Sequence, residues 1–110
     1  MIESNGQKLF GCFKGMEYDA NLCIEEFSDY LRFYNLLSKE TILRHILSQQ
    51  RGYSGGKSFD IFTGEEIGPM SIIVDGEFTF PADYVYYMEH YDIGIPPEYE
   101  QYLIETVGLK

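Results

Sequence analysis

The chain has 110 residues, enough for one domain with one hydrophobic core. Eighteen acidic and eight basic side chains give a formal net charge of −10, and 45% of the residues are apolar. That apolar share excludes a disordered chain, and a surface this acidic repels phosphates, so we expect no direct binding of nucleic acid. No apolar run approaches the length of a membrane span and the start shows no secretion signal, so we expect a cytoplasmic protein without a membrane partner.

The excess negative charge lies entirely in residues 58–110. Residues 1–57 carry seven acids and seven bases, whereas residues 58–110 carry eleven acids and one base, Lys110. Six of the ten tyrosines lie in the same second part. This distribution has two interpretations: a solvated surface that keeps a small protein soluble, or a surface that attracts a basic partner.

Residues 1–51 are expected to form a helical half. Apolar residues recur at a helical period between residues 21 and 37, at Ile24, Phe27, Leu31 and Tyr34. Ser38 is a good N-cap for a second helix over residues 39–50, which would bury Ile42, Leu43, Ile46 and Leu47. The glycine-rich run over residues 52–56 then predicts a flexible loop, with Gly52 at the end of that helix.

Residues 57–110 are expected to form a β-hairpin and two more helices. The pattern predicts strands over residues 58–62 and 69–74, and Asp75-Gly76 predicts a two-residue hairpin turn into a strand over residues 77–80. In that register Ile73 faces Phe78, and Phe80 shares their buried side.

Tyrosine-rich helices are predicted over residues 81–91 and 97–107. The first would bury Tyr84, Tyr87, Met88 and Tyr91, and the second would bury Tyr99, Tyr102, Leu103, Thr106 and Val107. Glu98, Glu100 and Glu105 are expected to point into solvent. The whole chain is therefore predicted to be a single α+β domain, a small antiparallel sheet with a β-hairpin packed by about four helices.

The sequence contains no motif that indicates catalysis. Residues 52–58 resemble a phosphate-binding loop in composition, but one spacer residue is missing and the loop would run from helix to strand. Residues 60–71 fail the calcium-loop pattern, since Phe62 and Glu65 stand where an oxygen ligand and a glycine are needed. We expect no catalytic residue, no cofactor and no metal.

The cysteines and histidines also lack a recognisable spacing. Ten residues separate Cys12 from Cys23, and although one disulfide is conceivable, free buried thiols are expected. His45 and His90 are the only histidines, and the spacing places neither beside a nucleophile.

The acids and tyrosines of the second half are the remaining candidates for function. Tyrosine offers rigid contact area with a polar end, and carboxylates around it would speed encounter with a basic partner. Tyr86 falls outside the predicted buried stripe and is the best single interface candidate. The predicted partner-binding residues are Asp60, Glu65, Glu66, Asp75, Glu77, Asp83, Tyr86, Glu89 and Asp92.

Three stretches of the second half carry a family resemblance. They read Asp60-Ile-Phe-Thr-Gly-Glu-Glu, then Ser71-Ile-Ile-Val-Asp-Gly-Glu-Phe-Thr-Phe-Pro-Ala-Asp-Tyr-Val-Tyr-Tyr, then Tyr91-Asp-Ile-Gly-Ile-Pro-Pro-Glu-Tyr. This pattern resembles the bacterial immunity proteins of contact-dependent growth inhibition and related polymorphic toxin systems. The resemblance implies a cytoplasmic antitoxin that binds a cognate toxin domain, often a basic nuclease, and blocks it.

Two other functions stay open at this point. The chain could be a general acidic interaction module or nucleic-acid mimic, which would bind several basic proteins instead of one. It could also be a small enzyme, which would need a concave pocket that gathers His45 or His90 with carboxylates or a thiol.

Overall fold

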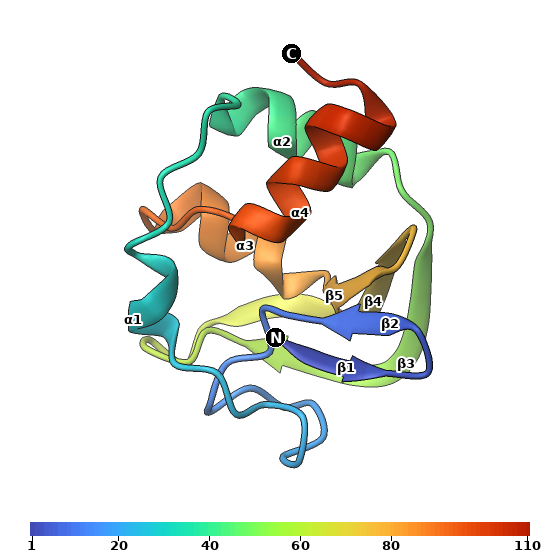
Figure 1. Ribbon diagram of the computed structural model, residues 1–110. Coiled ribbons are helices and arrows are strands. Elements are labelled where there is room, and N and C mark those ends of the chain that lie inside the picture. The colour runs from blue at the N-terminus through green and yellow to red at the C-terminus, as the bar shows by residue number, and fades with distance from the viewer.

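The protein is a mixed sheet packed by helices, as the computed structural model shows for residues 1–110 apart from the side chain of Ser54 (Figure 1). The strands are β1 (Ile2–Ser4), β2 (Gln7–Leu9), β3 (Arg51–Phe59), β4 (Glu66–Asp75) and β5 (Phe78–Pro81). The helices are α1 (Phe27–Tyr30), α2 (Lys39–Leu47), α3 (Asp83–His90) and α4 (Pro97–Tyr102), which continues as a π-helical turn over Leu103–Val107. The predicted α+β class is confirmed, but the sheet is not wholly antiparallel as predicted, because β2 pairs with β5 in parallel.

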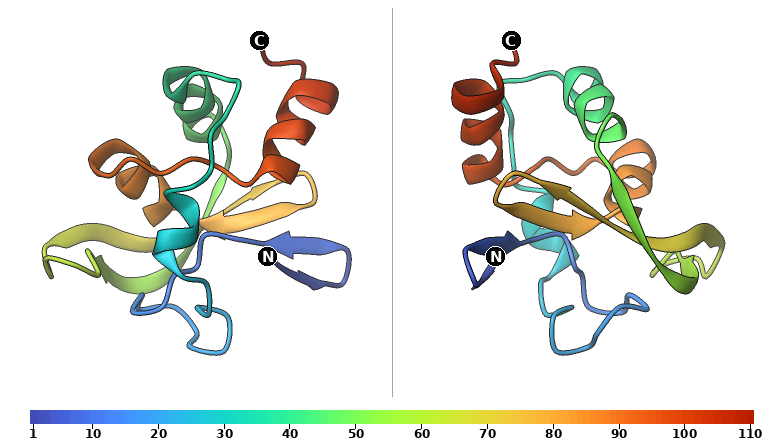
Figure 2. Two further views of the ribbon diagram at one scale, coloured as in Figure 1. Left: turned by 60° about the vertical axis from the view of Figure 1, so that its left-hand side comes forward. Right: turned by 90° about the vertical axis from the view of Figure 1, so that its right-hand side faces the viewer.

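The sheet has the strand order β1-β2-β5-β4-β3, with the β4–β5 hairpin near its middle. Helices α2, α3 and α4 lie together on one side of the sheet, whereas the loop between β2 and α1 extends on the other side (Figure 2). The buried apolar side chains form one cluster, in which Phe10 contacts the rings of Phe78, Phe80, Tyr84 and Tyr99. Burial of these rings against the sheet is the main favourable contribution to folding.

The predicted hairpin forms, but its turn lies one residue later. Asp75 pairs with Phe78 and Ile73 with Phe80, so the two loop residues are Gly76 and Glu77. Gly76 has a φ of 60°, the conformation that the first residue of a type II′ turn requires. Because the register differs by two residues, the predicted faces are unchanged, and Ile73, Phe78 and Phe80 are buried as expected.

The glycine-rich run over residues 52–56 is part of a strand, so the predicted loop is wrong. It belongs to β3, an edge strand that pairs with β4 on both sides of an irregularity between Tyr53 and Lys57. Gly55 and Gly56 have φ values of 76° and 84° at this irregularity, and Gly52 does not have a positive φ. The glycines therefore indicate a bulge within a strand.

The helix predicted over residues 21–37 is wrong for most of its length, since α1 has only four residues. Upstream of α1, Glu25 pairs with Phe13 in an isolated parallel bridge. Downstream, the Asn35 amide group donates to the Ile95 carbonyl oxygen at 3.0 Å and accepts from the Ile95 N–H at 2.9 Å. These distant partners hold the flanking segments in turns and irregular backbone, which overrides the local helical period.

The prediction for α2 is confirmed in its start and its buried face. The Ser38 hydroxyl accepts from the Thr41 N–H at 3.1 Å, and Ile42 and Ile46 are buried. Leu47 is exposed and α2 ends there, three residues earlier than predicted.

The last two helices also form, with three corrections. Thr106 and Val107, which were predicted to be buried, are exposed. Pro81 ends β5, so α3 begins at Asp83. Glu100 does not point into solvent: it is buried, and its carboxylate accepts from the Leu37 N–H at 2.9 Å. This contact connects α4 to the residue before the cap of α2.

Candidate protein-interaction site

Asp60 organises the turn that follows β3. Its carboxylate accepts from the N–H groups of Phe62 and Thr63 at 2.7 and 3.2 Å and from the hydroxyls of Tyr86 and Tyr91 at 2.7 and 2.8 Å. Burial alone would raise the pKa of this carboxyl, but the hydrogen bonds together outweigh burial and lower the pKa. The turn is thereby fixed to α3 through an ionised, buried carboxylate.

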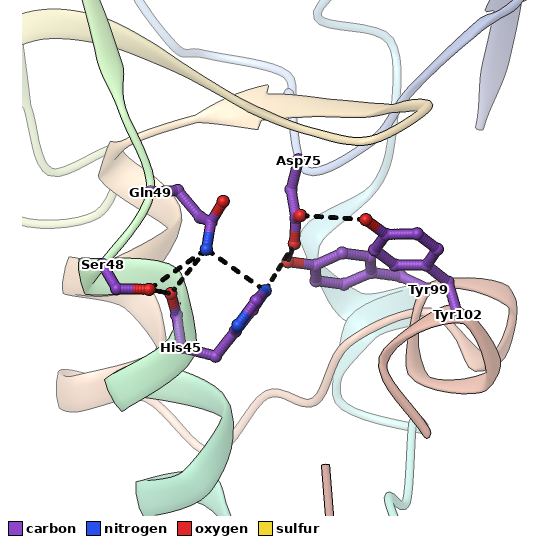
Figure 3. Close-up of polar contacts among 6 residues, drawn as sticks. All are labelled: His45, Ser48, Gln49, Asp75, Tyr99 and Tyr102. Carbon is purple, nitrogen blue, oxygen red and sulfur yellow. Dashed lines mark hydrogen bonds and ion pairs between the residues drawn. The ribbon is translucent and has the colours of Figure 1, made fainter. Parts of the chain in front are cut away.

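Asp75 is the centre of a second buried cluster, which Figure 3 shows between α2 and α4. Its carboxylate accepts from the hydroxyls of Tyr99 and Tyr102 at 2.6 and 3.2 Å and lies 2.8 Å from His45 Nε2. Burial is the largest of the causes that raise the pKa of Tyr99, and its hydrogen bond to Asp75 is the next. The hairpin, α2 and α4 are joined at this one carboxylate.

The cluster around His45 is not arranged as a nucleophilic triad. The Ser48 hydroxyl donates to the His45 carbonyl oxygen at 2.6 Å, so it is directed to the helix backbone (Figure 3). The Gln49 amide group also donates to that carbonyl oxygen at 3.2 Å. A triad needs a hydroxyl directed at the imidazole, and these contacts are instead those of a helix C-terminus.

Asp83 is the third buried aspartate of the second half. One of its oxygens accepts from the Tyr18 hydroxyl at 2.8 Å and from the Ser58 hydroxyl at 3.0 Å. Burial raises the pKa of the Asp83 carboxyl, and the two hydrogen bonds lower it by less. Asp60, Asp75 and Asp83 were all predicted to contact a partner, and the structure places all three in the interior.

Tyr86 is half-buried on α3. Its hydroxyl donates to Asp60, which raises the pKa of Tyr86 to about 12, and its ring stacks on His90 at a centroid distance of 4.2 Å. His90 is exposed, so the Tyr86–His90 pair is partly accessible to solvent.

The other five predicted partner residues lie on the surface. Three of them have a lysine nearby: Glu66 lies 3.3 Å from Lys57, Glu77 lies 3.7 Å from Lys8, and Asp92 lies 3.9 Å from Lys39. Among the described side chains, Glu65 and Glu89 have no basic side chain within ion-pair distance. Surface ion pairs of this kind are weak, so the carboxylates remain available to a lysine or arginine of a partner.

A groove that sequence reasoning missed lies between α1, the turn after β3 and the end of α3. It has a volume of about 520 Å³, and its lining includes Phe27, Leu31, Phe62 and Tyr91, with the acids Glu26 and Asp92 at its rim. We call this the acid-rimmed groove. Its residues come from three separate segments, so no local pattern could predict it; the single available signal was the apolar period that includes Phe27 and Leu31.

No family model, curated protein or solved structure matches this chain. Any function must therefore be argued from the chain's own chemistry. Within the part of the chain that the structure describes, no helix has both the length and the apolar character needed to cross a membrane.

The remaining chemical groups are buried or bound within the fold. Cys12 and Cys23 are free buried thiols, as predicted, and burial raises the pKa of both. Thiols with a raised pKa stay protonated at neutral pH and are therefore poor nucleophiles. His90 Nδ1 lies 3.0 Å from the Tyr86 carbonyl oxygen, at the end of α3. What the surface offers is a set of carboxylates beside an apolar groove, an arrangement suited to binding a protein.

Proposed function

We propose that this protein is a cytoplasmic immunity protein that binds a cognate basic toxin domain and neutralises it by occlusion. The observation that carries the proposal is the charge that remains on the surface of residues 58–110. Four of the eleven acids there are buried and seven are exposed, and Lys110 is the single base of that stretch. Lysines of the first half lie within ion-pair distance of four of the seven. The exposed acids are Glu65, Glu66, Glu77, Glu89, Asp92, Glu98 and Glu105.

Such a surface can occupy a toxin site built for phosphates. Carboxylates present negative charge to the same lysines and arginines that a nuclease uses for its substrate, so a bound antitoxin excludes the nucleic acid. The long-range field also speeds encounter, which matters because an inhibitor must reach its toxin before the toxin reaches its target.

The direct test is co-expression with the toxin domain encoded beside this gene, followed by purification at low and high salt. We expect a one-to-one complex at about 50 mM salt that loses toxin activity and that dissociates more readily as salt screens the charges. Absence of binding at low salt would overturn the proposal. Equal binding of several unrelated basic proteins, such as lysozyme and histones, would favour a general acidic module instead.

A charge-reversal pair tests whether the second half provides the steering surface. Glu65→Lys with Glu89→Lys is expected to slow association about tenfold and to weaken its salt dependence, while the far-UV spectrum stays unchanged. The matched control is Glu3→Lys with Glu17→Lys, which makes the same change of net charge at exposed positions of the first half. Equal slowing in both pairs would mean that total charge, and not this surface, governs association.

A further inference from the structure

We infer that the acid-rimmed groove is the anchoring site for the partner, taking one apolar side chain of a basic protein with a lysine or arginine next to it. The inference rests on the proposed function for the existence of a basic partner, and it adds the place and the chemistry of contact. It also assigns α1 and the residue after it, which belong to the nearly neutral first half, to the interface.

The floor of the groove is aromatic and open to solvent. The ring centroids of Phe27 and Phe62 are 4.9 Å apart, and Tyr91 lies 5.5 Å from Phe27 and 5.3 Å from Phe62. Phe62 is 56% exposed and Leu31 is 46% exposed, although both are large apolar residues. An apolar side chain placed here would remove these surfaces from water, which is the contact that dominates binding at hot spots.

The floor is held in place before any partner arrives. Asp60 accepts hydrogen bonds from the Phe62 N–H and from the Tyr91 hydroxyl, so one buried carboxylate fixes the backbone at Phe62 and the ring of Tyr91. Phe27 is fixed from below by the fully buried Phe13, at a centroid distance of 5.1 Å. A rigid receptor loses little conformational entropy on binding.

The rim determines the charge of the occupant. Glu26 and Asp92 are the two charged residues in the lining, and among the described side chains no lysine or arginine lines the groove. Glu26 is paired with Lys14 at 2.5 Å, so Asp92 is the acid of the rim with the weaker ion pair. Asp92 is fully exposed with its nearest cation, Lys39, at 3.9 Å, so its charge is available to a lysine or arginine of the partner. A second copy of this chain is a poor occupant, because each copy carries a net charge of −10 and brings the same acids.

A peptide titration tests the groove without any toxin. The ¹⁵N-labelled full chain is titrated with two pentapeptides of equal charge, one with phenylalanine between two lysine pairs and one with serine at that position. We expect the phenylalanine peptide to bind on the order of tenfold more tightly and to shift the amide signals of residues 26–31, 62, 91 and 92. Equal affinity of the two peptides, or shifts confined to another surface, would overturn the inference.

A matched pair of variants separates the groove from simple charge. Leu31→Glu adds an acid to the groove. If charge alone attracts the phenylalanine peptide, this variant should bind the peptide as tightly as before or more tightly. If the groove is an apolar anchor, the variant should bind the peptide at least tenfold more weakly. Leu47→Glu is the control, since Leu47 is a leucine of similar exposure, 56%, on α2 outside the groove, and we expect a change within twofold. Leu31→Ser, expected to weaken binding in the same direction, provides a second test if the glutamate disturbs the fold. Undiminished binding by a folded Leu31 variant would overturn the anchor.

The two proposals can fail separately. If the phenylalanine peptide occupies the groove but the neighbouring toxin domain does not bind, the immunity role fails and the groove remains. If the toxin complex forms and Leu31→Glu leaves its dissociation rate unchanged, the groove fails and the immunity role remains.

Discussion

The second half of the chain directs four of its eleven acids into the interior, whereas the first half leaves large apolar side chains on the surface. Each of the six tyrosine hydroxyls in the second half has an internal partner, and four of them donate to Asp60 or Asp75. In the first half, Tyr34 and Leu36 are 91% and 90% exposed. The composition of a segment therefore does not say what it presents to a partner. In the second half, tyrosine and aspartate side chains bind each other in the interior, and part of the apolar contact surface, Phe27 and Leu31, comes from the first half.

Removal of an internal carboxylate is expected to have the largest effect on stability. Asp75→Ala leaves His45, Tyr99 and Tyr102 without their acceptor in a buried site, so we expect the free energy of unfolding to fall by about 3 kcal/mol or more. Glu105→Ala, an exposed acid of the same half, should change it by less than about 0.5 kcal/mol. Urea denaturation followed by circular dichroism measures both, and equal effects would contradict an internal role for Asp75.

A second variant tests how the first half is attached to the second. A Cβ on Gly94 would run into the Phe33 carbonyl oxygen and would approach Asn35 Oδ1 to 2.6 Å. We therefore expect Gly94→Ala to cost about 1–3 kcal/mol in urea denaturation and to disturb the amide signals of residues 31–37. Gly52→Ala is the control, because a Cβ there has no atom within 4 Å. A neutral Gly94→Ala would show that the two segments are not in close contact.

The buried aspartates should respond to pH with opposite signs. The pKa of Asp60 is lowered in the fold, so its stabilisation is present above the unfolded value of about 3.9 and is lost as the pH falls through the folded value. The pKa of Asp83 is raised, so the fold is favoured most below that unfolded value and loses stability as the pH rises through the folded value.

Replacing each aspartate by asparagine tests these signs. As the pH rises from 3 to 7, the stability of Asp60→Asn relative to the unmodified chain should fall. Over the same rise in pH, the stability of Asp83→Asn relative to the unmodified chain should increase. Urea denaturation at four or five pH values measures the difference. Parallel curves for the two variants would contradict the opposite environments of the two carboxyls.

The smallest expected effect concerns the exposed apolar residues of the first half. Tyr34→Ser and Leu36→Ser remove little buried surface, so each should change the free energy of unfolding by less than about 0.5 kcal/mol. The neighbouring Leu37 is buried, and Leu37→Ser should cost about 2 kcal/mol or more by thermal or urea unfolding. A large loss at Tyr34 or Leu36 would mean that these side chains belong to the core.

Local signals predicted the elements that local interactions decide. The cap of Ser38, the stripe of Ile42 and Ile46, and the buried faces of the β4–β5 hairpin follow from spacing within a few residues. The Asn5-Gly6 pair was an overlooked signal of the same kind: both residues have positive φ values, 51° and 78°, in the turn between β1 and β2.

Predictions that depend on distant partners were wrong or missing. The helical period of residues 21–37 could not reveal that Asn35 is bound to Ile95, and the acidity of the second half could not reveal that Tyr99 and Tyr102 would meet Asp75. The acid-rimmed groove needs three segments together, so it could be found only once the fold was known. Of the nine predicted partner residues, five acids lie on the surface, Tyr86 is half-buried and three aspartates are buried.

The parallel pairing of β2 with β5 has a consequence for how the chain folds. Lys8 pairs with Phe78, seventy positions later, and the fully buried Phe10 follows directly after β2. Closing so long a loop costs chain entropy before the favourable free energy of the contact is gained. Folding is therefore slower than in proteins whose contacts are local. During synthesis the pocket of Phe10 can form only after β5, α3 and α4 have left the ribosome, because their rings surround Phe10. We expect the sheet to close late and in one step, with the hairpin and α2 already formed around the place that Phe10 will fill.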